Sequence, residues 1–184
     1  MINSVGGKIG RAQIKNSSKI FLVIGDKTTF KLDNLKIDDG LLNIDASIDS
    51  SSMLVSALLK NVPINPLLTI SGHKIIGTMD GAIKAEGAIN DLHVSGQLKL
   101  SNGKYDYKQY GIKLKDISTT IKANGRLINF SEILAKDRFG NSLQGDGKVS
   151  LAEQYAFSFN MASKKLNLIN TPYMYGELMC VSTY

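Results

Sequence analysis

Apolar and polar side chains alternate from about Thr28 to Leu168, and this period of two limits most strongly how the chain can fold. A strand places successive side chains on opposite faces of a sheet, so such a chain presents one apolar face and one polar face. In the clearest stretch, Ile75, Met79 and Ile83 hold odd positions while Lys84 holds an even one. The pattern predicts an all-β fold with over half of the residues in strands.

The alternating stretches are long and are separated by short turn signals. They run to roughly 10 to 15 residues, whereas a typical strand has about 5 to 6. Dipeptides of asparagine, aspartate and glycine favour tight turns between strands. Such signals occur at Asp38-Asp39-Gly40, Asn90-Asp91, Asn102-Gly103, Asn124-Gly125 and Gly140-Asn141. An extended sheet is therefore favoured over a compact sandwich.

Glycines recur inside the strand-like stretches, where a glycine costs about 0.5 to 1 kcal/mol relative to alanine. Glycine in a strand permits sharp coiling and close approach of the backbone, which can offset that cost. The positions concerned are Gly77, Gly81, Gly87, Gly96, Gly145 and Gly147. We therefore predict a strongly curved sheet that forms an apolar groove.

One segment breaks the alternation and predicts a short amphipathic helix near residues 51–62. A serine is available as the N-cap, and Pro63 ends the run. The apolar residues at helical spacing are Met53, Leu54, Ala57, Leu58 and Val62. We expect this helix to cap one end of the sheet, or else to dock to a partner or a membrane surface.

Residues that commonly carry catalysis or bind metals form no recognisable set. His73 and His93 lie on either side of a predicted turn, and neither has cysteine or carboxylate neighbours at metal-ligand spacing. The single cysteine, Cys180, cannot form an internal disulfide. We expect it to pack as a small apolar side chain and not to act as a nucleophile. Gly145-Asp146-Gly147 lacks the strand-to-helix context of a phosphate loop. We predict a non-enzymatic protein with no metal site and no cofactor.

The net charge of +6 does not indicate a nucleic-acid partner. Only three of the 22 basic residues, Arg11, Arg126 and Arg138, are arginines, whose planar group reads phosphate and guanine edges. The lysines alternate with apolar residues, which is typical of a solvated outer face. Weak attraction to anionic lipid headgroups is compatible with the same charge.

The sequence predicts no transmembrane helix. The longest unbroken apolar run, Ile20 to Ile24, is far shorter than the roughly 18 to 20 residues that a spanning helix needs. Residues 1–11 contain no continuous apolar stretch of the kind found in a secretory signal. If the protein works outside the cytoplasm, we expect an upstream segment in the full-length protein.

A longer motif runs through the second half of the chain. A Pro-Leu element after Pro63 is followed by spaced glycines, a turn and the pattern V-x-G-x-L-x-L-x-N-G-x-Y, and the series closes on G-D-G-x-V-x-L at residues 145–151. This order and spacing, over about residues 63–168, resembles the carboxy-terminal region of TamB, a translocation and assembly module subunit of the AsmA-like superfamily. The matching positions include Gly77, Thr78, Gly81, Gly87, Val94, Gly96, Leu98, Leu100, Asn102, Gly103, Tyr105, Gly111, Ile112, Leu114, Asp116 and Ile117.

The resemblance implies a taco-like β-groove in the periplasm and cell envelope of a Gram-negative bacterium. It implies carriage of phospholipid between the inner and outer membranes, and support for the assembly and secretion of outer-membrane proteins. The full-length family is anchored in the inner membrane and partners an outer-membrane barrel of the TamA type. Because this chain carries neither the anchor nor the family's terminal strands, we expect a fragment of a longer protein. Residues 1–62 would form leading strands and the short helix, and residues 63–184 the TamB-like groove segment.

The alternation also predicts which side chains would contact phospholipid acyl chains. Acyl chains transfer to an apolar lining at about 25 cal/mol per Å² of surface buried, and this requires no directional chemistry. The predicted lining consists of Ile75, Met79, Ile83, Ile89, Leu98, Leu100, Leu143, Val149, Leu151, Phe157, Phe159 and Met161.

Two other kinds of protein would show a similar alternation. In a β-solenoid or adhesin-like binding module of a secreted protein, the same apolar face would be a packed core, with coils repeating at a fixed period of about 20 to 30 residues. The spacing here is irregular. An outer-membrane barrel would band its aromatic residues at strand ends, whereas these tyrosines cluster. A hollow interior supports the groove, and a filled interior supports the binding module.

Overall fold

A computed structural model describes residues 5–9, 12–16, 18–65, 73–88, 90–152, 156–171 and 174–180. These residues form thirteen strands and one 3-10 turn, with no α-helix among them, which confirms the all-β prediction. The elements are β1 (Val5–Ile9), β2 (Ala12–Asn16), β3 (Ile20–Val23), β4 (Lys27–Ile37), β5 (Gly40–Asp49), β6 (Ser52–Pro63), β7 (His73–Ala88), β8 (Asp91–Tyr107), η1 (Lys108–Tyr110), β9 (Ile112–Gly125), β10 (Leu127–Asp137), β11 (Ser142–Ser150), β12 (Ala156–Thr171) and β13 (Met174–Cys180).

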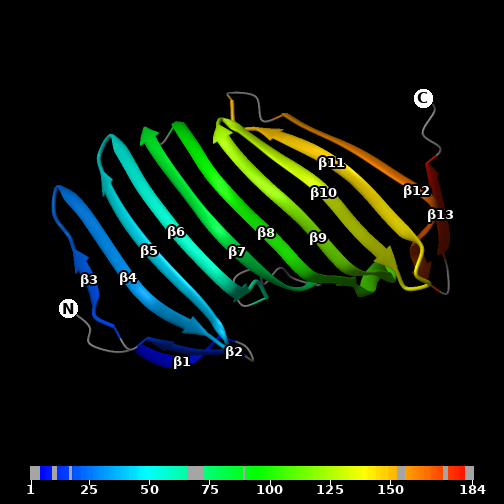
Figure 1. Cartoon of the computed structure of the whole chain (residues 1–184), viewed down its shortest axis with the longest axis horizontal. Coiled ribbons are helices and arrows are strands. Elements are labelled where there is room, and N and C mark those ends of the chain that lie inside the picture. Colours follow the sequence, from blue (N-terminus) through cyan, green and yellow to red (C-terminus); the bar gives the residue numbers. More distant parts are fainter. Residues whose placement is uncertain are drawn as a thin grey trace.

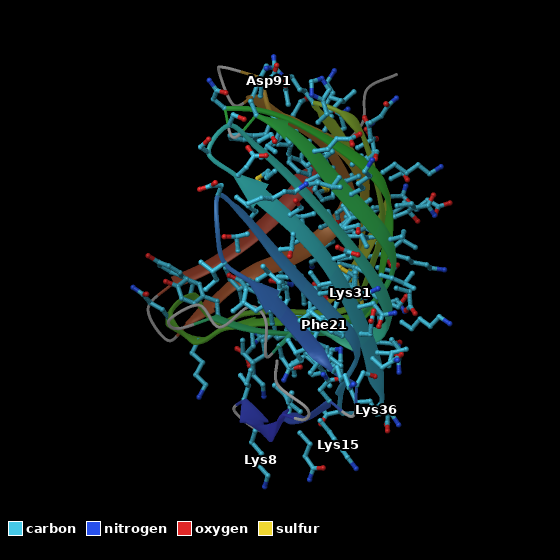
Figure 2. The ribbon with its side chains drawn as sticks, turned by 90° about the vertical axis from the view of Figure 1, so that its left-hand side faces the viewer. Lys8, Lys15, Phe21, Lys31, Lys36 and Asp91 are labelled. Carbon is cyan, nitrogen blue, oxygen red and sulfur yellow. The ribbon has the colours of Figure 1, made fainter. Side chains whose placement is uncertain are left out.

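All thirteen strands belong to one antiparallel sheet whose spatial order follows the sequence (Figure 1). The one deviation is β4, which pairs with β3 along its first half and with β2 along its second. Within the described residues no pairing joins β1 to β13, so the sheet stays open. Seen from its β3 side, the sheet is bent into a curl (Figure 2).

The predicted helix at residues 51–62 is wrong, because this segment is strand β6. The carboxylate of Asp49 accepts hydrogen bonds from the backbone and hydroxyl groups of both Ser51 and Ser52, at 2.8 to 2.9 Å. The two serines therefore close the tight turn between β5 and β6 and do not cap a helix. Pairing with β5 and β7 on both sides then holds β6 extended.

Two outward leucines explain the helical spacing of that segment. Met53, Val55 and Ala57 alternate toward the interior of the curl, as a strand requires. Leu54 and Leu58 point outward and are 43% and 41% exposed. These two exposed side chains added apolar residues at even positions, and the sequence pattern then matched a helix better than a strand.

Bulges on β4, β6, β8 and β10 bend the sheet. Asn34, Asn61, Asn102 and Glu132 each have a positive φ between 48° and 58° and lie at shifts in the pairing register. A bulge bends its strand and increases the local twist. Two of the backbone amides that the ladder leaves free are bonded by side chains, since Asn34 N–H donates to Asn43 and Asn61 N–H donates to Asp80.

Glycine is required at two positions where the backbones of β7 and β8 leave no room for a Cβ. Gly81 and Gly96 have φ angles of 128° and 126°, which L side chains rarely adopt. A Cβ on Gly81 would lie 2.1 Å from the carbonyl oxygen of Gln97, and one on Gly96 would lie 2.3 Å from that of Ala82. The curved sheet predicted from the strand glycines thus has a local cause at these two positions.

The expected division at residues 62 and 63 does not interrupt the sheet. Residue 63 is the last residue of β6, and β6 pairs with β7 from Ser52 opposite Ala88 to Pro63 opposite Thr78. The leading strands and the later strands therefore form one continuous layer.

Among the described residues, no helix is long and apolar enough to span a bilayer.

Candidate functional site

The interior face of the curl is apolar across nine consecutive strands. Residues that pair directly across neighbouring strands point to the same face, so the register identifies every member of a row. One row runs through Leu35, Leu42, Leu59, Gly81, Leu98, Ile121, Phe130, Gly147 and Phe159. This interior face is the candidate functional site.

The register places the described members of the predicted lining that lie within strands on this one face, in two groups. The first group lies on β7 and β8, where Met79 pairs with Leu100, and comprises Ile75, Met79, Ile83, Leu98 and Leu100. The second lies on β11 and β12 and comprises Leu143, Val149, Phe157, Phe159 and Met161. Leu151 directly follows β11 and lies outside the paired register. Ile89 lies outside the described residues. Contact with acyl chains stays a prediction for every one of these residues.

Sequence reasoning missed the lining contributed by β4 to β6 and by β9 and β10. The missing members include Leu42, Ile44, Leu59, Val62, Ile112, Leu114, Ile117, Ile121, Ile128, Phe130 and Ile133. Alternation was visible within these stretches, but bulges reverse the parity partway along β6 and β10. Only the pairing register shows that both halves of such a strand face the same interior.

On the flanking strands β3 and β12, exposure of the interior side chains rises from one end of the strand to the other. On β12, Ser163 is 6% exposed, Met161 36% and Phe157 79%. On the opposite side of the curl, Ile20 is 9% exposed and Leu22 is 50% exposed. We call the strand ends near Ile37, Val62 and Asp137 the closed end, and those near Leu22, Ile48 and Phe157 the open end. In Figure 1 the closed end lies at the lower edge of the sheet and the open end at the upper edge.

A compact apolar cluster seals the closed end beneath β4 to β6. Ala12, Ile37, Leu42, Leu59 and Val62 are at most 8% exposed and pack together. The β1–β2 hairpin contributes to this seal, because β2 pairs with β4 through Ile14 opposite Ile37. Met79 and Leu98 pack against the cluster from β7 and β8.

A buried carboxylate organises the closed end on the other side of the curl. Asp137 is fully buried and accepts hydrogen bonds from the backbone N–H groups of Phe139, Asn141 and Asn167 and from the Asn141 side chain, at 2.8 to 3.0 Å. Burial raises the pKa of Asp137, but these four hydrogen bonds outweigh that effect and lower the pKa below its ordinary value of 3.8. The carboxylate thereby ties β12 to the β10–β11 turn.

Aromatic rings cover the interior where β11 lacks side chains. Phe130 and Phe159 lie on either side of Gly147 in the same row, with ring centroids 5.6 Å apart. A Cβ on Gly147 would lie 2.1 Å from the Phe159 ring, so the glycine leaves the space that this ring fills. Phe159 is nevertheless 42% exposed, which leaves much of its surface uncovered.

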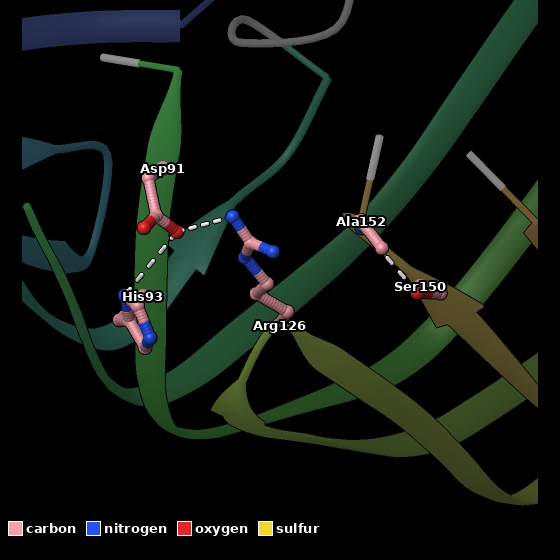
Figure 3. A network of polar contacts seen from close by, with 5 residues as sticks. All are labelled: Asp91, His93, Arg126, Ser150 and Ala152. Carbon is pink, nitrogen blue, oxygen red and sulfur yellow. Dashed lines mark hydrogen bonds and ion pairs between the residues drawn. The ribbon is translucent and has the colours of Figure 1, made fainter. Parts of the chain in front are cut away.

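Polar contacts join the turns at the open end, and Figure 3 shows those around Asp91 and Arg126. The Arg126 guanidinium in the β9–β10 turn forms an ion pair with Asp91, the first residue of β8, and His93 Nδ1 lies 3.8 Å from the same carboxylate. The carbonyl of Arg126 accepts a 2.7 Å hydrogen bond from the backbone of Leu151. These contacts hold the hairpins together without covering the interior.

The outer face of the sheet is polar and carries its own hollows. Exposed ion pairs such as Lys84 with Glu86, at 2.6 Å along β7, lie on this face. A hollow of about 1100 Å³ lies over β8 to β12, and most of its lining residues, among them Glu132, Gln144 and Asp146, belong to the polar face. The lining also includes Ile133, Phe159 and Met161, so it is mixed in polarity, and we assign the candidate site to the more apolar interior face.

Comparisons with protein-family models, with curated proteins and with solved structures gave no match to this chain. The chemistry of the site is therefore argued from its own residues. Among the described residues, no group of three or more histidine, cysteine, aspartate or glutamate side chains is placed to hold a metal ion. The interior face offers apolar surface, and Asp137, the one fully buried carboxylate among the described residues, is engaged by four hydrogen bonds.

Proposed function

We propose that this chain is a non-catalytic segment of an envelope-spanning β-groove protein that carries phospholipid in its interior. The acyl chains would lie against the interior face, and the polar outer face would meet water. The observation that carries the proposal is the row of apolar residues across nine strands of a sheet that curls without closing. Burying apolar surface contributes about 25 cal/mol per Å², and a lipid chain can supply that cover.

The gradient of exposure supports a lipid-carrying groove more than a fully packed interior. At the open end, Leu22, Ile48, Phe157 and Phe159 are 40% to 79% exposed on the inward side of the curl. These exposed apolar side chains on β3, β5 and β12 offer surface to a ligand, a protein or a membrane. In the full-length protein this surface would be part of a conduit between the inner and outer membranes in the periplasm of a Gram-negative bacterium.

The TamB-like motif adds a wider role to the proposal. A TamB-type protein would support the assembly and secretion of outer-membrane proteins together with a barrel partner of the TamA type. This chain would contribute the groove, and the contact with the barrel would belong to other parts of the full-length protein.

A second candidate is a β-solenoid or adhesin-like binding module. The sealed cluster of Ala12, Ile37, Leu42, Leu59 and Val62 favours it, because those side chains are packed as in an ordinary core. In that case the interior would be structural throughout, and the exposed apolar residues would be covered by a protein partner.

Native mass spectrometry of the chain purified from cells tests the lipid proposal. We expect phospholipid to be bound to the wild-type chain and to be lost from Phe159→Asp, since a charge on the exposed part of the interior repels acyl chains. Lys99→Asp, on the outer face, is the matched control and should retain lipid. Absence of lipid from the wild-type chain, or equal loss from both variants, would favour the binding module.

A further inference from the structure

Four basic side chains surround a hollow on the outer face at the closed end. Lys104 lies on β8, Lys113 and Lys115 lie on β9, and Arg138 follows β10 in the turn to β11. Together with Tyr105, Asp106 and Leu114 they line a hollow of about 300 Å³. Among the described residues, no ion pair joins any of these four cations to a carboxylate. The four cations outnumber Asp106, the one carboxylate in this lining, so the hollow keeps a net positive charge that attracts an anion.

The two ends of the sheet differ in charge. Around the hollow, further lysines extend the positive surface on the same strand ends, at Lys74, Lys108 and Lys136. Of the nearby carboxylates, Asp116 pairs with Lys136 at 3.2 Å, and Asp106 lies between Lys74 and Lys113 in the register. At the open end, acidic and basic residues nearly balance, and the described ones comprise Asp26, Lys27, Asp49, Lys84, Glu86, Asp91, Lys122, Arg126 and Lys148.

Exposed aromatic rings stand beside the basic hollow. Phe139, at the tip of the β10–β11 turn, is 61% exposed, and the Arg138 guanidinium lies 4.5 Å from the centre of its ring. Tyr110, in the turn between β8 and β9, is 41% exposed. Both turns lie at the same end of the strands (Figure 1). Aromatic rings flanked by lysine and arginine are the combination found at the headgroup level of membranes.

We propose that this basic hollow and its two aromatic turns dock on the surface of a membrane that contains anionic phospholipid. The lysines and Arg138 would meet lipid phosphates, while Phe139 and Tyr110 would enter the headgroup layer. Free inorganic phosphate carries the same group as a lipid headgroup and could bind the same basic side chains. It would leave the exposed aromatic rings without a role, whereas a membrane surface gives them one. This docking surface lies on the outer face, so the inference does not depend on whether the interior carries lipid.

Cosedimentation with vesicles tests this surface. The full chain should bind vesicles of equal parts phosphatidylcholine and phosphatidylglycerol, and should not bind phosphatidylcholine alone. Each lysine near an anionic surface contributes about fivefold to binding, so Lys104→Gln/Lys113→Gln/Lys115→Gln should weaken binding roughly 100-fold. The control Lys99→Gln/Lys122→Gln/Lys148→Gln removes the same charge from exposed outer-face positions away from the hollow and should weaken binding by no more than about threefold.

Three outcomes would overturn the docking surface. One is an equal loss of binding in both triple variants, which would mean that only net charge matters. Another is the absence of binding to the anionic vesicles. The third is displacement by inorganic phosphate beyond that by chloride at matched ionic strength, which would mean that the hollow is a free-phosphate site.

Phe139→Ser should lower vesicle binding severalfold while leaving its salt dependence unchanged. Circular dichroism checks that each variant is folded.

Discussion

The closed and open ends of the interior have the same residue chemistry but different packing. At the closed end, Leu59 and Val62 are at most 8% exposed because the β1–β2 hairpin and β4 to β7 converge on them. At the open end, Leu22 and Phe157 lie on the same face and are 50% and 79% exposed. Alternation decides which way a side chain points, whereas the approach of distant strands decides whether it is covered. One sheet can therefore combine a structural core with a surface free for a ligand.

The largest expected effect comes from placing a charge at each end. Leu59→Asp would bury an unpaired carboxylate and should lower the free energy of unfolding by several kcal/mol. Leu22→Asp makes the same chemical change on the same face, where the new charge can hydrate, and should cost less than about 1 kcal/mol. Urea unfolding followed by circular dichroism measures both. Similar losses for the two variants would show that the open end is packed as well.

The curl that creates both ends depends on glycine at a few positions. Gly96→Ala would force a Cβ against the backbone of β7 at a positive φ and should destabilise the chain by about 1 to 3 kcal/mol. Gly7→Ala is the matched control, because nothing lies within 4 Å of its Cβ position, and it should be neutral or slightly stabilising. Thermal unfolding compares the two, and a neutral Gly96→Ala would contradict the proposed origin of the curl.

The two ends should also respond differently to acid. The folded pKa of Asp137 is lowered, so its contribution to stability is fully present above its unfolded pKa of about 4 and is lost as pH falls through the folded value. Asp137→Asn should cost about 1 to 3 kcal/mol at neutral pH and should flatten the stability profile in the acid range.

Asp49 provides the comparison at the open end. Hydrogen bonds from Ser51 and Ser52 lower the pKa of Asp49 to about 2, but this carboxylate lies in a solvated turn. Asp49→Asn should therefore change the pH profile less than Asp137→Asn does. Denaturation at a series of pH values measures the slopes, and a larger change from Asp49→Asn would reverse our ranking of the two carboxylates.

The smallest effect is expected from the network that ties the turns of the open end. Arg126→Ala removes an exposed ion pair with Asp91 but keeps the backbone bond to Leu151. Such pairs contribute about 0 to 1 kcal/mol and are screened by salt. The loss in stability should shrink further at high ionic strength. A large loss that does not depend on salt would mean that this network, and not the closed end, holds the curl together.

Much of the fold could be predicted from the sequence, because a period of two predicts both that a segment is a strand and which side chains share a face of the sheet. Alternation around Ile75 to Ile83 and from Phe157 to Met161 predicted strands and their common face. The prediction for the segment that forms β6 was wrong because Leu54 and Leu58 are apolar and yet point outward. Periodicity alone cannot reveal this orientation. Burial of Asp137 was equally hidden, since its partner Asn167 is remote in sequence and meets it only when the sheet curls.

The central claim is that the interior changes from sealed to available along a single strand. A photo-crosslinking residue placed at Phe157, Phe159, Met161 or Ser163 in the full-length protein in cells samples that gradient on one face of β12, with Lys84 and Lys99 as outward controls. We predict phospholipid adducts at Phe157, Phe159 and Met161, and few at Ser163 or at the two lysines. Absence of lipid adducts from all four β12 positions, or equal yields at the lysines, would contradict the account.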